Sequence, residues 1–114
     1  MTIKRIDVGP RMSQAVVHGN TVYLAGQVAK GASVTEQTSA VLKGIDDLLA
    51  AAGTDKTKLL SATIWLADLS TFAEMTSVWD RWVSAGNSPA RATVEAKLAA
   101  PDYRVEIAVI CAIS

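Results

Sequence analysis

Cysteine and histidine are almost absent from this sequence. Its 114 residues include one cysteine, Cys111, and one histidine, His18. A lone cysteine excludes a disulfide within the chain and is typical of a reducing compartment. One cysteine and one histidine cannot form a Cys/His cluster, so the sequence predicts no metal site. Cys111 alternates with apolar residues, which favours a buried structural thiol over a nucleophile. His18 lies beside a predicted turn, which favours a surface position.

Charge is also sparse, and neither sign is in excess. Eleven Lys and Arg balance eleven Asp and Glu, and charged residues make up 19% of the chain. A nucleic-acid binder or a polybasic membrane-surface protein would show a basic excess, so neither partner is expected. Half of the residues are hydrophobic, which excludes intrinsic disorder. With so few charges to cover its surface, the chain is expected to bury part of it between subunits.

Long hydrophobic runs are missing as well. The longest, Val105–Ile113, is interrupted by Glu106 and is too short to cross a bilayer. Met1–Gly9 alternates charged and apolar residues and lacks the apolar core of a secretion signal. No repeat or linker interrupts the chain. We therefore expect a single domain over residues 1–114 in a cytoplasmic protein.

The first half of the chain predicts three strands and a helix. Residues 2–7 alternate and form a short edge strand, and residues 15–18 and 21–25 flank a two-residue hairpin turn. Ser33 and Glu36 then form a capping box. The helix that follows carries apolar residues at the spacing of one helical face and ends before Gly53. These apolar residues are Val41, Leu42, Ile45, Leu48, Leu49 and Ala52.

The second half predicts a strand, a helix and two final strands. Residues 59–66 show little alternation of apolar and polar side chains, which favours a strand buried on both faces. Asp68 and Ser70 are candidate caps for the next helix, and Pro89 prevents its continuation. The apolar face of that helix consists of Phe72, Met75, Val78, Trp79, Trp82 and Val83, with both tryptophans interpreted as core residues.

Residues 91–98 and 103–113 are interpreted as a terminal hairpin joined by residues 99–102. The last strand alternates, with Glu106 opposite the apolar side. The order β-β-β-α-β-α-β-β predicts an α+β sheet with both helices on one face. The other face is left bare, and another subunit would supply its second layer.

Common catalytic and cofactor motifs are absent. The chain has no GxGxxG, P-loop, HExxH or GxSxG sequence, so no cofactor is expected. Arg91 follows Pro89 at the start of a strand, and arginine holds a small carboxylate with a bidentate fork. Glu106 lies among apolar neighbours, where a carboxylate must be paired or functional. On spacing alone, ion pairs of these two side chains at a subunit contact are the favoured interpretation.

Three stretches together resemble the RidA/YjgF family of reactive-intermediate (enamine/imine) deaminases. The likeness extends over essentially the whole chain, and its Trp79–Trp82 region is closer to a bacterial side branch than to archetypal RidA. The stretches are Val22–Gln27, Gln37-Thr38 with Ile45–Leu49, and Pro89–Glu95 with Val105–Ile107.

This resemblance implies a chorismate-mutase-like fold, a mixed six-stranded sheet backed by two helices. It also implies a homotrimer with ligand sites between subunits and no cofactor. By the same resemblance, Arg91 would hold the substrate carboxylate and Glu106 would orient the attacking water.

Several pocket positions depart from the archetypal members. Thr93 replaces a cysteine, Ala25 a serine or threonine before Gly26, and Thr76 an asparagine. An aromatic residue near the N-terminal Gly-Pro is replaced around Arg11 and Met12. The substrate-binding candidates implied by the resemblance are therefore Arg91, Thr93, Ala25, Gly26, Arg11 and Thr76.

The hypothesis is hydrolysis of reactive 2-imino acids, such as those from 2-aminoacrylate, to 2-keto acids and ammonia. The alternative is a non-catalytic trimeric protein that binds a small carboxylate metabolite. A nucleic-acid role is the weakest reading, since the net charge is zero.

Overall fold

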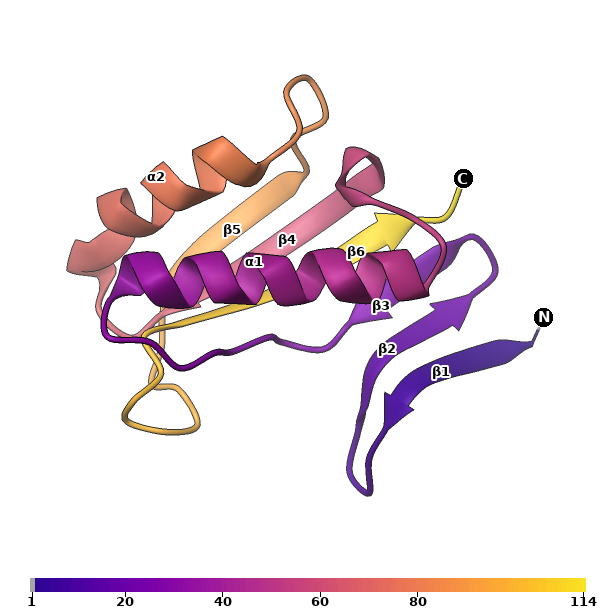
Figure 1. Ribbon diagram of the computed structural model, residues 1–114, viewed down its shortest axis with the longest axis horizontal. Helices are drawn as coiled ribbons and strands as arrows, with labels where there is room; N and C mark the ends of the chain where they lie inside the picture. The colour runs from indigo at the N-terminus through magenta and orange to yellow at the C-terminus, as the bar shows by residue number, and fades with distance from the viewer. Residues whose placement is uncertain (1) are drawn as a thin grey trace.

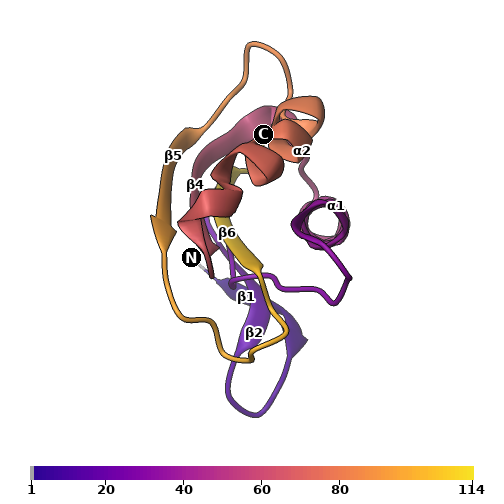
Figure 2. The ribbon, with the colours of Figure 1, turned by 90° about the vertical axis from the view of Figure 1, so that its left-hand side faces the viewer.

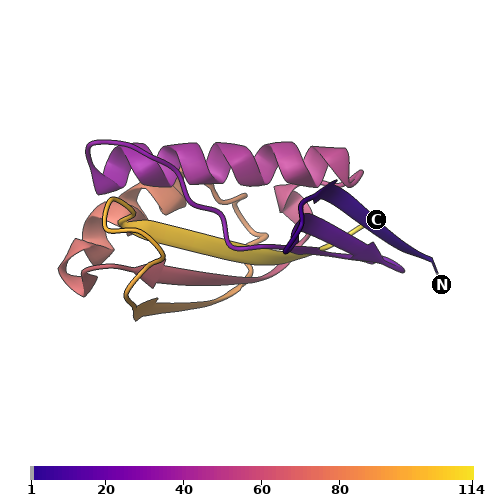
Figure 3. The same cartoon turned by 90° about the horizontal axis from the view of Figure 1, so that it is seen from below.

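The computed structural model describes residues 2–114 as one mixed six-stranded sheet with two helices on a single face (Figures 1 and 3). The strand order is β1-β2-β3-β6-β4-β5. The predicted α+β architecture is confirmed. The elements are β1 (Ile3–Val8), β2 (Ser13–His18), β3 (Thr21–Leu24), α1 (Val34–Ala51), β4 (Leu59–Leu66), α2 (Phe72–Trp82), β5 (Ala90–Glu95) and β6 (Val105–Ala112), with short 3₁₀ turns at Lys56–Lys58 and Leu69–Thr71.

The helix α1 begins and ends much as the sequence predicts. The Ser33 hydroxyl accepts a hydrogen bond from the Glu36 amide at 3.1 Å. The Glu36 carboxylate reaches back to the Ala32 amide at 2.9 Å, one residue earlier than a capping box requires. After the helix, Gly53 adopts φ +86°, the left-handed conformation that glycine takes without a steric penalty.

Two glycines of this region provide a matched pair of substitutions. Gly44 lies inside α1 and Gly53 beyond its end, and an added Cβ meets nothing within 4 Å at either position. Gly44→Ala is expected to stabilise the protein by about 0.5–1 kcal/mol, because alanine loses less backbone entropy in a helix. Gly53→Ala is expected to destabilise it by about 1 kcal/mol, because its φ is left-handed. Thermal unfolding of both variants checks the opposite signs, and equal shifts would contradict this account.

The start of α2 differs from the prediction. The Asp68 carboxylate accepts from the Ser70 amide at 2.9 Å, but this bond caps the 3₁₀ turn that precedes the helix. Thr71 is the residue at the helix boundary, and its side chain makes no capping bond. The predicted cap at Asp68 therefore serves the 3₁₀ turn and not α2 itself.

The terminal hairpin expected from the sequence is wrong. β5 pairs in parallel with β4, and β6 pairs antiparallel with β4 on its other side and with β3. The segment between β5 and β6 passes the end of β4 and places β6 near the middle of the sheet (Figure 1). The parallel pair arises because α2 forms a crossover between β4 and β5, and such a crossover returns the chain in the same direction.

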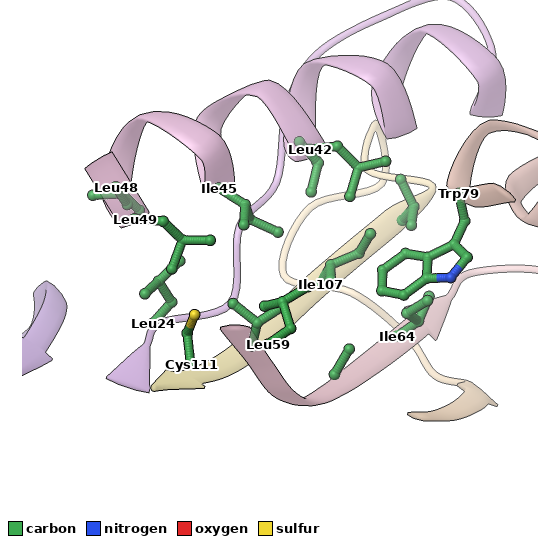
Figure 4. Packing of buried hydrophobic residues seen from close by; sticks show 14 of the residues in the cluster. Leu24, Leu42, Ile45, Leu48, Leu49, Leu59, Ile64, Trp79, Ile107 and Cys111 are labelled. Atoms are coloured by element: carbon green, nitrogen blue, oxygen red, sulfur yellow. The ribbon is translucent and has the colours of Figure 1, made fainter. Parts of the chain in front are cut away.

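The core lies between the sheet and the helices, and Figure 4 shows α1 side chains directed at those of β4 and β6. Cys111 belongs to this cluster, and burial raises the pKa of its thiol, which supports a structural role. His18 is exposed, as expected. No helix among residues 2–114 is long and apolar enough to cross a membrane.

The face of the sheet opposite the helices is uncovered by this chain (Figure 2). β4 therefore has one buried face, and its expected burial on both faces is wrong for a single chain. Tyr23 and Val94 are 47% and 48% exposed on the uncovered side. Trp65 is half-buried there. Apolar residues that point away from the core leave this face suited to a second layer.

Candidate active site

Arg91 lies on the helix side of the edge strand β5. It pairs in register with Ala62 of β4, whose side chain is buried beneath the helices. Its guanidinium carbon is 5.6 Å from the centre of the Phe72 ring and 5.4 Å from that of Trp79, both on α2. The side chain is half-buried, and within residues 2–114 it forms no ion pair and no hydrogen bond. The guanidinium is thus a cation without an acidic partner among residues 2–114.

Two threonines on the same two elements carry hydroxyls without partners. Thr93 follows Arg91 by two residues on β5 and points to the same side. Thr76 lies between Phe72 and Trp79 on one face of α2, since positions i, i+4 and i+7 share a face. Both hydroxyl oxygens are buried and make no hydrogen bond within the described chain. Buried polar atoms of this kind are rare in proteins, so a ligand is a natural partner.

Glu106 projects from β6 on the uncovered face of the sheet. Its neighbours Val105 and Ile107 are fully buried on the helix side, so the glutamate points the other way. It lines a small pocket of about 230 Å³ with Trp65 and the segment after β5. The backbone of Gly26 lies directly against its carboxylate, since a Cβ added there would be 2.0 Å from Glu106 Oε2.

Backbone and side-chain hydrogen bonds fix the surroundings of Glu106. Gln27 and Ile107 exchange two backbone hydrogen bonds, of 2.8 and 3.1 Å, which hold Gly26 beside the glutamate. Gln37 of α1 is fully buried. Its Nε2 donates to the Asp102 carbonyl at 2.9 Å, and its Oε1 accepts from the Arg104 amide at 2.8 Å. Gln37 therefore anchors the segment that leads into β6.

Arg91 and Glu106 do not meet within one chain. On β4, Ala62 lies opposite Arg91 and Trp65 lies opposite Glu106. Arg91 and Glu106 are therefore separated by one intervening strand and by three positions along it. Strand geometry makes this about 10 Å across and about 10 Å along the sheet. They also point to opposite faces. A small substrate could contact both only where two chains meet.

The remaining candidates lie beside Glu106 or in the turn between β1 and β2. Ala25 and Gly26 follow β3 on the side of Glu106, where the Ala25 amide donates to the Gln14 carbonyl at 2.9 Å. Arg11 is exposed in the turn between β1 and β2, beside a hollow of about 480 Å³. The Gln14 and Gln27 side chains are bonded at 3.0 Å and link this turn to the Gly26 backbone.

Sequence reasoning missed Phe72 and Trp79 as parts of the site. Both appeared as members of an apolar helical face, and Trp79 is indeed a core residue, 4% exposed. Figure 4 shows Trp79 reaching from α2 toward Ile64 of the sheet. A ring can pack in the core with one part and contact a cation with another. The signal available in the sequence was the shared helical face of Phe72, Thr76 and Trp79.

The fold matches that of known YjgF proteins. A crystal structure of a YjgF family member from Neisseria meningitidis superposes with a TM-score of 0.98 and 45% sequence identity, covering 100% of this chain and 97% of that one. The family model described as Endoribonuclease L-PSP matches residues 2–113. The chain belongs to this family, also called RidA/YjgF, and the resemblance seen in the sequence is confirmed.

Curated relatives divide into two groups. The RutC family protein YoaB of Escherichia coli is 46% identical over 114 residues, covering 99% of this chain and 100% of YoaB. A 2-iminobutanoate/2-iminopropanoate deaminase of Rattus norvegicus is 32% identical over 106 residues, covering 86% of this chain and 77% of that protein. The family thus includes imine deaminases, while the more similar relative carries only a family name.

Proposed function

We propose that this protein hydrolyses 2-imino acids, including those formed from enamines, to 2-keto acids and ammonia. The observation that carries the proposal is Arg91, a half-buried guanidinium that has no acidic partner in the part of the chain that the structure describes. The Thr93 hydroxyl, also unpartnered within those residues, lies on the same face. An arginine fork binds a planar carboxylate with two parallel hydrogen bonds. The 2-imino acids carry such a carboxylate next to the reacting carbon.

Glu106 supplies the second half of the proposed chemistry. Its carboxylate would accept a proton from water as the oxygen adds to the imine carbon, giving a carbinolamine. Return of that proton to the nitrogen, followed by transfer of the remaining hydroxyl proton to it, would let the C–N bond break as the C=O bond forms, so that one imine and one water become one ketone and one ammonia. Free imines already hydrolyse in water, and an acceleration of about a hundredfold requires only some 3 kcal/mol. Positioning of the two reactants alone can provide that much.

The proposal includes a homotrimer with its sites between subunits. Arg91 and Glu106 point to opposite faces of one sheet, so a site that uses both needs two chains. The apolar side chains on the uncovered face, among them Tyr23 and Val94, support an assembly that covers them. Light scattering in solution checks the assembly, and a monomer at micromolar concentration would argue against this arrangement.

A coupled assay tests the activity. An L-amino-acid oxidase generates imino acids from several amino acids, and semicarbazide traps whatever imine survives. Faster loss of trappable imine with the protein than with buffer would support deamination, and the amino-acid series would rank substrates. If a folded protein accelerates none of them, the non-catalytic carboxylate-binding alternative becomes the better account, because it uses the same Arg91.

Cleavage of RNA is less well supported, although the description of the family model names an endoribonuclease. The net charge of zero provides no excess cation for a phosphate backbone. Incubation with a labelled single-stranded RNA, alongside the imine assay, would reveal such an activity.

A further inference from the structure

Arg91 is held by aromatic rings rather than by acids. Phe72 and Trp79 are seven residues apart on α2, which is about two helical turns or 10 Å. The guanidinium carbon is within 6 Å of both ring centres, so both rings contact the same cation. Ring faces attract cations through their quadrupole and offer no acceptor to the N–H groups.

Trp79 is itself fixed by its surroundings. Its ring packs against Trp82 with centroids 5.3 Å apart and planes tilted by 51°. The Trp82 indole N–H donates to the Asp46 carboxylate of α1 at 3.0 Å. α1 and α2 therefore hold one ring in place, while Phe72 is 40% exposed and adds the second contact at the surface.

We propose that Phe72 and Trp79 are positioning residues for carboxylate binding by Arg91. The rings restrict the rotamers of a long side chain and leave its N–H groups free, since no acid among the described residues pairs with them. A carboxylate then binds to a guanidinium that is already ordered, which removes part of the entropic cost of binding. The inference rests on the proposed function only in taking that carboxylate to be the substrate's.

Phe72 is the better position for a test, because its exposure allows replacement without a cavity in the core. Phe72→Leu keeps an apolar side chain but removes the ring, and Phe72→Tyr keeps the ring. Pyruvate, a 2-keto acid with the required carboxylate, serves as the probe in isothermal titration calorimetry of the full protein. Phe72→Leu is expected to weaken pyruvate binding about three- to tenfold, the size of a partly exposed cation–π contact. Phe72→Tyr is expected to restore most of that affinity.

The experiment distinguishes failure of the positioning role of Phe72 from failure of the proposed deaminase activity. If Phe72→Leu binds pyruvate as tightly as Phe72→Tyr, the positioning role is wrong. If wild type does not bind pyruvate at millimolar concentration, Arg91 is not a carboxylate site and the inference fails with it. If wild type binds pyruvate but hydrolyses no imine, only the proposed deaminase activity fails. Where imines are hydrolysed, Phe72→Leu is expected to raise KM with little change in kcat, which a general loss of structure would not produce.

Discussion

Arg91→Ala is expected to lower kcat/KM for imine hydrolysis by at least about a hundredfold, because it removes both hydrogen bonds of the carboxylate fork. Arg91→Lys keeps the charge but not the planar fork, and an intermediate loss of about tenfold is expected. The fold should survive both changes, since Arg91 makes no ion pair or hydrogen bond within residues 2–114. Steady-state kinetics with trapped imines measure the losses, and circular dichroism reports the fold.

Arg81, on helix α2, provides a matched control for the loss of an arginine side chain. It is exposed on α2, and within residues 2–114 its guanidinium donates only to the Ser77 hydroxyl, at 3.1 Å. Arg81→Ala is expected to change kcat/KM by less than about twofold, since exposed side chains of this kind contribute little. Full activity in Arg91→Ala would remove the carboxylate fork from the mechanism. Dissociation of the proposed trimer in that variant alone would instead assign Arg91 to a subunit contact.

Helix α1 shows what local sequence signals can predict. Its cap at Ser33, its apolar stripe and its terminal Gly53 all act within a few residues of one another. The same is true of the tight turn between β2 and β3, where Gly19 adopts φ +63°. Local geometry decides these features, so the spacing of a few side chains is sufficient to predict them.

The sheet order depends on contacts that local spacing does not encode. Two strands separated by a short segment favour a hairpin, yet β6 lies on the far side of β4 from β5. The buried Gln37, 65 and 67 residues from its two partners in that segment, holds the crossing in place. Pairing between elements this distant is set by the whole fold, which explains why the terminal hairpin was predicted wrongly.

The candidate site likewise has features that the local sequence predicts and features that only the whole fold determines. Arg91 and Glu106 stand out because their residue types are unusual in their local surroundings. The contact of Arg91 with Phe72 and Trp79 requires α2 to lie over β5, and the placement of Glu106 on the opposite face requires the register of three strands. The sequence therefore predicts the reactive groups, whereas the tertiary structure determines that one chain cannot bring them together.

Gly26→Ala is expected to lower kcat/KM for imine hydrolysis about a hundredfold while the fold persists. The added Cβ would lie 2.0 Å from Glu106 Oε2 and 2.9 Å from its Cδ, so the carboxylate must move. The atoms displaced are the far end of a flexible side chain, and Gly26 does not have a positive φ, so no backbone strain is added. Loss of a well-placed general base costs about a hundredfold or more, while thermal unfolding should change by less than about 1 kcal/mol.

A double-mutant cycle tests whether this loss acts through Glu106. Glu106→Ala alone is expected to be as inactive as Gly26→Ala, and the two changes together should lose no more than either one. Gly44→Ala controls for the substitution itself, because its Cβ meets no atom within 4 Å and it lies far along the sequence in α1. Additive losses in the double variant would mean that Gly26 contributes independently of the carboxylate, for instance through its own backbone. Full activity in Gly26→Ala would mean that the position of the Glu106 carboxylate against Gly26 is not the one used in catalysis.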